Sequence, residues 1–281
     1  MLVKTFCAAV NGMQVTTVTV EVSSVIGDKL FLSGLADNAV REAQSRIFSA
    51  ITNIGMQYPM KRITVNLAPA DIRKEGSAFD LPIAIGILAS DGQITDERLH
   101  EYMLIGELGL DGSIKPVKGA LPIAIRARAE HFKGLIVPEE NVREAAVVNN
   151  LEVYGMSTLS DVIMFLNGMT APEPVTIDTR AEFYTNQAET GLDFAEVRGQ
   201  ENVKRAFEVA AAGGHNLIMI GPPGSGKSMM AKRLPGILPP LTLRESLETT
   251  QIYSIAGKMP EGVSLLYRRP FRAPHHTVSQ V

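Results

Sequence analysis

Apolar and polar residues alternate near the start of the chain, and a period of two is typical of strands with one buried face. The alternation is clearest over residues 15–22, where threonine or glutamate separates the valines. The period then lengthens to that of a helix, which Asp37 or Asn38 can cap and Gly55 ends. Residues 62–69 predict another strand, so the chain opens with strands and one amphipathic helix.

A run that is apolar on every side follows at residues 79–90, FDLPIAIGILAS. A helix that is hydrophobic all round is buried, so this run predicts a helix between two layers. Pro82 stands in its first turn, where a missing N–H costs little. Residues 102–119 predict a β-hairpin with Asp111-Gly112 at the turn, because that pair tolerates positive φ.

Helical and strand patterns then alternate up to the end of a first domain. Further helices are expected at 120–132, 139–148 and 157–168, and a buried strand is expected at 134–138. This mixture is typical of an α/β or α+β domain, which we place at residues 1–167.

A linker and a second domain are expected next. Residues 168–190 contain Pro172 and Pro174 and show no sustained period, which is typical of a linker. Residues 191–281 predict the second domain. Its expected elements are a helix at 201–212, a short buried strand at 216–220, a helix at 241–257 with Thr242 and Glu245 as a capping box, and then a loop or hairpin.

Composition describes a globular protein without a charge bias. The chain has 281 residues, of which 45% are hydrophobic and 20% charged, and its formal net charge is −3. Bulk charge therefore gives no support for nucleic-acid or membrane binding. Cys7 is the single cysteine, which excludes an internal disulfide and fits a reducing compartment. No run approaches the roughly 18 apolar residues of a membrane span, and the first residues do not resemble a signal peptide. We expect a cytoplasmic protein that does not bind membranes.

A glycine-rich loop carries the clearest chemistry. The pattern G-x-x-x-x-G-K-[ST] is matched without a gap by Gly221, Pro222, Pro223, Gly224, Ser225, Gly226, Lys227 and Ser228. Glycine allows the positive φ that the loop needs to aim its N–H groups at a triphosphate. Lys227 is expected to reach the β- and γ-phosphates, and the Ser228 hydroxyl to ligate Mg²⁺. The motif predicts ATP and Mg²⁺ as ligands.

The parts that an ATPase uses for hydrolysis do not follow this loop. Such enzymes hold Mg²⁺ and orient water with acidic residues at the end of another strand, and an arginine usually meets the transition-state charge. No apolar strand ending in Asp-Glu comes after Ser228, and too few residues follow for a parallel sheet with both faces covered. We therefore expect the chain to end inside its ATPase domain, to bind nucleotide weakly and to hydrolyse none.

Long collinear stretches resemble one protein family. AAAGGHNLIMIGPPGSGKSMMAKRLPGILPPL and RRPFRAPHHT resemble the magnesium-chelatase-like branch of the AAA+ ATPases. GLADNAVREAQSRI, RITVNLAPADIRKEGSAFDLPIAIGIL and GELGLDGSIKPVKGALPIA resemble the amino-terminal domain of the YifB/ComM group of that branch. The resemblance covers nearly the whole chain except the linker.

The resemblance implies a fold, a site and a function. The fold would be an α+β domain of the Lon-protease, ribosomal-S5-domain-2-like type, followed by the first part of a P-loop AAA+ domain, which forms hexamers in full-length proteins. In this family the segment VRGQ packs near the adenine, which implies that Val197 and Gly199 belong to the nucleotide site; a plain helix N-terminus is the alternative for this segment. The implied function is an ATP-driven DNA translocase or branch-migration helicase linked to natural transformation, with single-stranded or branched DNA as partner.

Two other functions are alternatives. The chelatase resemblance also implies a chaperone-type ATPase for metal insertion, although the chelatase subunit lacks the amino-terminal domain. The second alternative is a non-enzymatic module that recruits a partner through the first domain.

A peptidase is a further hypothesis that the Lon resemblance raises. Lon-type enzymes pair a serine nucleophile with a lysine base, because serine alone is weak at neutral pH. Aligning the helices places Phe79 or Asp80 at the position of the nucleophile and Leu121-Pro122 at that of the lysine, while Lys118 precedes its helix. We therefore expect no peptidase activity, and we interpret Ser77 as a helix cap.

A basic stretch at residues 267–276 interleaves arginines with tyrosine and phenylalanine. Arginine can neutralise phosphates while an aromatic ring stacks on a base, so this stretch is a candidate DNA contact. A solvated loop is the alternative. His275 and His276 lack the cysteine or carboxylate spacing of a metal site, and we expect none there.

Overall fold

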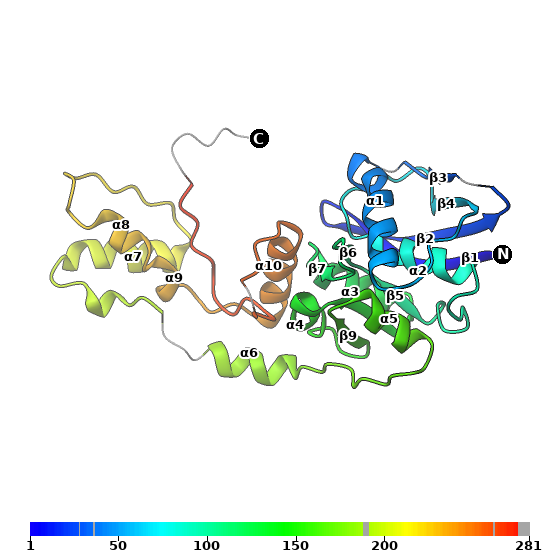
Figure 1. Cartoon of the computed structure of the whole chain (residues 1–281). Helices are drawn as coiled ribbons and strands as arrows, with labels where there is room; N and C mark the ends of the chain where they lie inside the picture. The colour runs from blue at the N-terminus through cyan, green and yellow to red at the C-terminus, as the bar shows by residue number, and fades with distance from the viewer. Residues whose placement is uncertain (28, 36, 188–190, 261, 275–281) are drawn as a thin grey trace. The chain divides into compact units, whose positions relative to one another are not determined.

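The computed structural model describes residues 1–27, 29–35, 37–187, 191–260 and 262–274 (Figure 1). These residues form two compact units. The first contains Met1–Thr179 and Glu248–Leu265, and the second contains Arg180–Leu247 and the residues that follow Leu265.

A seven-stranded sheet is the frame of the first unit, with strand order β3-β4-β2-β1-β5-β8-β9. β2 is antiparallel to both β1 and β4, whereas all other neighbours are parallel. The strands are β1 (Leu2–Asn11), β2 (Gln14–Val25), β3 (Leu30–Ser33), β4 (Arg62–Ala68), β5 (Tyr102–Leu104), β8 (Gly134–Pro138) and β9 (Glu152–Met156).

In the described residues before 179 the helices are α1 (Asn38–Asn53), α2 (Asp80–Ser90), α3 (Ala120–Ala129), α4 (Val142–Ala145) and α5 (Leu159–Leu166). α2 is buried along its whole length and packs against β1, β2 and α1, as its all-round apolar pattern predicted. The N-terminal cap of α1 is Asp37, whose carboxylate accepts from the N–H of Val40 at 2.8 Å. Local capping chemistry thus sets where this helix begins.

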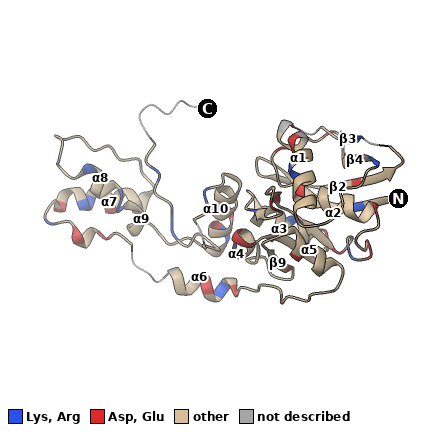
Figure 2. Cartoon of the chain, viewed as in Figure 1, with Lys and Arg blue, Asp and Glu red and all other residues tan. Residues whose placement is uncertain are grey.

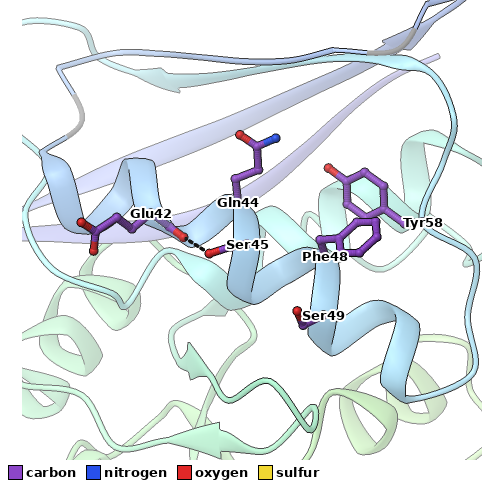
Figure 3. Close-up of a pocket in the computed structure, with 6 residues that line it drawn as sticks. All are labelled: Glu42, Gln44, Ser45, Phe48, Ser49 and Tyr58. Carbon is purple, nitrogen blue, oxygen red and sulfur yellow. Dashed lines mark hydrogen bonds between the residues drawn. The ribbon is translucent and has the colours of Figure 1, made fainter.

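The outward face of α1 carries a shallow hollow of about 400 Å³ (Figure 3). Phe48 and Tyr58 line it with their rings 5.0 Å apart, and the Ser45 hydroxyl donates to the carbonyl oxygen of Glu42 at 3.0 Å. Phe48 is half exposed. A single aromatic pair of this kind is ordinary at a protein surface.

The described helices from residue 179 onward are α6 (Thr179–Gln187), α7 (Glu201–Gly213), α8 (Lys227–Ala231), α9 (Leu234–Ile237) and α10 (Leu243–Ile255). In the second unit, Val197, Phe207 and Met230 form a buried apolar cluster. Charges of both signs are interspersed on α7, where Lys204 pairs with Glu201 (Figure 2). α10 begins with the predicted capping box, because the N–H of Thr242 donates to Glu245 at 2.8 Å and the N–H of Glu245 donates to the Thr242 hydroxyl at 3.2 Å.

The predicted hairpin at 102–119 is partly wrong. Only β6 (Glu107–Leu108) and β7 (Ile114–Lys115) pair as a hairpin, with Gly112 at φ +85° in the turn. β5 is fully buried and pairs in parallel with β1 and β8. Its apolar residues therefore lie inside the main sheet, which a local turn signal cannot reveal.

Two helical regions also differ from expectation. The expected helix at 139–148 is a 3₁₀ turn (Glu139–Asn141) followed by the short α4. Within the expected linker, α6 forms, with Phe183 buried and the Thr179 hydroxyl donating to the carbonyl oxygen of Val147 at 2.8 Å. The first compact unit accordingly extends to Thr179, beyond the predicted boundary at residue 167.

The buried strand expected at residues 216–220 does not form. Ile218 and Ile220 are 84% and 91% exposed. Every strand in the described residues lies in the first unit, so no neighbouring strand is present to supply the ladder hydrogen bonds that a buried parallel strand requires.

Within the described residues, no helix is both long enough and apolar enough to cross a bilayer.

Candidate nucleotide site

The glycine-rich loop leads directly into α8, whose first residue is Lys227. Gly224 and Gly226 have φ values of +81° and +83°, in the left-handed region that favours glycine. Residues 221–224 are exposed. The backbone thus turns sharply twice before the helix, and this turn is open to an incoming polyanion.

The Lys227 ammonium group lies within this loop. It donates to the carbonyl oxygens of Gly221 at 2.9 Å and Pro222 at 2.8 Å, and to the Ser225 hydroxyl at 3.2 Å. The loop therefore already surrounds a positive charge. Ser228 lies one residue further, in the first turn of α8, with its side chain exposed.

The segment before α7 approaches the same helix. Val197 is buried against Phe207 and against Met230 of α8. Gly199 and Gln200 follow in left-handed conformation, at φ +67° and +61°. The structure therefore places Val197 beside the helix that follows the loop, while Gly199 stays exposed in the turn that starts α7.

A hollow of about 350 Å³ adjoins the loop. Ser225 and Lys227 line one part of it, and the rest is largely apolar, with Val203, Met219 and Met230 among its walls. An apolar hollow beside a cationic loop combines the two surfaces that a nucleotide presents, a base and a polyphosphate. The donors present, amide N–H groups and an ammonium group, suit phosphate oxygens, and a hydroxyl such as that of Ser228 suits Mg²⁺.

Asp80 is one of the two residues, with Phe79, that we aligned with the nucleophile of Lon-type enzymes. Asp80 is fully buried and accepts from Arg46 through Nε at 2.7 Å and Nη2 at 3.0 Å, and from the N–H of Leu108 at 3.2 Å. Burial raises the pKa of Asp80, and the hydrogen bonds from Arg46 oppose that rise. This carboxylate is therefore held inside the fold by Arg46.

The interpretation of Ser77 as a helix cap is wrong. α2 has Phe79 at its N-cap position without a side-chain hydrogen bond, and the Ser77 hydroxyl instead donates to the carboxylate of Glu107. Lys118 precedes α3, as expected, and its side chain lies against Gly257. Serine and lysine thus have separate partners here.

One arginine of the basic stretch, Arg269, forms hydrogen bonds within the second unit. Arg269 donates to the carbonyl oxygen of Pro239 at 2.8 Å and to Glu245 at 3.4 Å. Arg268 and Arg272 lie at the surface. His275 and His276 lie outside the described residues.

Comparisons with known proteins follow the same division of the chain. A family model described as subunit ChlI of Mg-chelatase matches residues 18–141, and one described as magnesium chelatase, subunit ChlI, matches residues 193–281. The competence protein ComM of Haemophilus influenzae is 42% identical over 98% of this chain and 54% of that protein. YifB of Escherichia coli is 43% identical over 96% of this chain and 52% of that protein.

The chain belongs to the magnesium-chelatase-like family of ComM and YifB. Its predicted membership is thereby confirmed. The chain spans about half the length of these ComM and YifB relatives. Lon protease 2 of Bacillus subtilis is 24% identical over 48% of this chain and 25% of that protein. This likeness and the α/β sheet fit the predicted fold class, a Lon-like domain followed by a P-loop AAA+ segment.

Sequence reasoning missed two residues that shape this ComM/YifB-type chain. Arg46 lies on α1 and is 34 positions from its partner Asp80, so no local pattern links them. Arg233 follows α8 and bonds to the segment around residue 193, 40 positions earlier. A buried carboxylate in an otherwise apolar helix is the signal that could have indicated a cationic partner for Asp80.

Proposed function

We propose that this chain binds ATP with Mg²⁺ through residues 221–228, with Val197 and Gly199 near the base. The observation that carries the proposal is the Lys227 ammonium group held inside a loop with left-handed Gly224 and Gly226. Ser228 would ligate Mg²⁺, which in turn would offset the charge of the β- and γ-phosphates. Membership in a family of AAA+ type supports the same assignment.

Titration of the 281-residue chain with ATP should show weak binding that strengthens when Mg²⁺ is present. We expect no steady release of phosphate, because the sequence after Ser228 contains no apolar run ending in paired acidic residues. Calorimetry measures the binding and a phosphate assay measures turnover. Sustained turnover by this chain would contradict the second expectation, and heat unaffected by Mg²⁺ would contradict the role of Ser228.

We further propose that the full-length protein is a cytoplasmic ATPase that assembles as a hexamer and translocates DNA. The Haemophilus influenzae relative bears the name competence protein, and we extend a role in handling DNA to this chain. Arg268 and Arg272, the two exposed arginines of the basic stretch, lie on either side of the exposed Phe271, and we assign them to phosphate contact.

DNA binding should depend on salt and on these two arginines. Replacing Arg268 and Arg272 by alanine should lower the slope of log affinity against log salt by roughly 1.4, about 0.7 for each phosphate contact on single-stranded DNA. Fluorescence anisotropy with single-stranded and forked DNA across a salt series measures this. Arg205→Ala on α7 is the control, because Arg205 is exposed and pairs with Glu208. An equal slope in all variants would place the DNA contact elsewhere.

A further inference from the structure

Arg233 follows α8 and forms hydrogen bonds with a segment that lies about 40 residues earlier in the sequence. Its Nε donates to the carbonyl oxygen of Asp193 at 2.9 Å, and its Nη1 donates to that of Met229 at 3.0 Å. Its Nη2 donates to the carboxylate of Glu196. The Arg233 side chain is 11% exposed, whereas that of Glu196 is 54% exposed. The guanidinium group is thus largely covered, and its hydrogen bonds to protein oxygens run in three directions.

The segment that Arg233 holds is a preformed turn. Residues Phe194–Glu196 form one turn of 3₁₀ helix, and the Asp193 carboxylate accepts from the N–H of Ala195 at 2.9 Å. The N–H of Val197 donates to the carbonyl oxygen of Phe194 at 3.0 Å and closes the turn. Arg233 therefore donates to both ends of this turn, to the carbonyl oxygen of Asp193 and to the carboxylate of Glu196.

Apolar packing supports the same arrangement. The Phe194 ring packs at a tilt of 49° against that of Phe207, with ring centroids 5.2 Å apart, and Val197 is buried with Phe207 and Met230. At Gly236 a Cβ would lie 2.8 Å from the carbonyl oxygen of Leu192, so the backbones of α9 and this segment are in close contact. The turn is held against the helices that follow the phosphate loop.

The hydrogen bonds of Arg233 to Asp193 and Glu196, here called the clamp, join the segment before Val197 to the residues that follow the phosphate loop. Gln200 and Val203, which follow Val197, line the hollow beside that loop. α8 begins at Lys227, directly after the loop, and Arg233 follows α8 by two residues. A triphosphate needs only the loop, but a nucleoside that extends beyond it must also meet a second segment placed at a set distance. Planar arginine serves this better than lysine, because its fork of N–H groups can bond three acceptors in fixed directions.

We propose that Arg233 is a positioning residue for the nucleoside part of the ligand. It holds the turn Phe194–Glu196, and with it Val197, at the correct distance from the phosphate loop. The inference rests on the proposed ATP site and deepens it, since it assigns recognition of the nucleoside to a clamp that does not itself contact phosphate.

The test compares ATP with inorganic tripolyphosphate on the 281-residue chain by calorimetry. Arg233→Ala should weaken ATP binding about tenfold, the scale of one lost charge-assisted hydrogen bond, and should leave tripolyphosphate affinity unchanged. Arg233→Lys should recover part of the ATP affinity. Glu196→Gln should change it little, because that carboxylate is half exposed and glutamine still accepts a hydrogen bond.

The outcomes separate the clamp from the phosphate site. An equal loss of ATP and tripolyphosphate affinity in Arg233→Ala would mean that the residue only supports the loop, and it would overturn the proposal. Unchanged ATP affinity in a folded variant would overturn it as well. If the alanine variant does not fold, Arg233→Lys supplies the same comparison. A wild-type chain that binds tripolyphosphate but shows no preference for ATP contradicts the clamp alone, whereas one that binds neither contradicts the proposed function and the clamp with it.

Discussion

Replacing Lys227 by alanine is expected to weaken the binding of ATP to this chain about a hundredfold. The ammonium group is the positive charge that the loop encloses, with oxygens of Gly221, Pro222 and Ser225 around it. A hydrogen bond to a charged group contributes roughly 1.5–3 kcal/mol, and two phosphates share this lysine. The sum, about 3 kcal/mol, corresponds to two powers of ten in the dissociation constant.

Calorimetry with Lys232→Ala as a matched control makes this result specific. Lys232 is exposed, carries the same charge and follows α8 directly, so its loss tests the general effect of one positive charge. Thermal unfolding of the Lys227 variant should change little, because the carbonyl oxygens of Gly221 and Pro222 remain accessible to water. Equal ATP affinity for wild type and Lys227→Ala would remove the phosphate loop from the binding site.

The second large effect is expected from Arg46→Ala in the first unit. Asp80 is completely buried, and Arg46 supplies two of its hydrogen bonds. Removing one partner of a buried ion pair leaves the other charge buried without a counter-charge, and this typically lowers the free energy of unfolding by about 3–5 kcal/mol. We expect the free energy of unfolding to fall by that amount, measured by urea denaturation. Arg73→Ala, which breaks a pair in which both side chains are mostly exposed, should cost at most about 1 kcal/mol.

The cost of Arg46→Ala should depend on pH in a known direction. Burial already raises the pKa of Asp80 in the folded chain, and without Arg46 the pKa rises further. A carboxyl group with a raised folded pKa binds a proton more tightly in the folded state, so the destabilisation is complete above that pKa and shrinks as pH falls through it. The difference in stability between wild type and variant should therefore be larger at pH 8 than at pH 5.

Adding Asp80→Asn to the Arg46→Ala variant tests whether the buried Asp80 charge causes the loss of stability. The amide carries no charge to desolvate, so part of the lost stability should return and the pH dependence should disappear. A double variant with the same pH dependence as Arg46→Ala would show that another group titrates.

Local signals predicted the elements whose boundaries are set locally. Asp37 caps α1, Thr242 and Glu245 cap α10, and the all-round apolar pattern of α2 is enough to indicate its burial. The phosphate motif likewise located a loop with left-handed glycines and a helix beginning at Lys227.

Long-range partnerships were not predictable from those signals. β5 joins the main sheet because β1 and β8 lie on either side of it, and β9 was missed altogether. The residues 216–220 have a strand-like composition, but composition alone cannot provide the neighbouring strands on which a strand depends. In the site, the hydrogen bonds of Arg233 connect segments whose approach is a result of tertiary packing.

The pairing of Asp80 with Arg46 also bears on how such a fold changes its chemistry during evolution. A serine at position 80 would stand at one of the two positions, 79 and 80, that we aligned with the nucleophile of a Lon-type enzyme, yet that one replacement would leave the guanidinium of Arg46 without its carboxylate. We therefore expect that single replacement to lower stability without supplying the base that a serine nucleophile needs. A change of position 80 alone would then be tolerated less well than a change of positions 46 and 80 together.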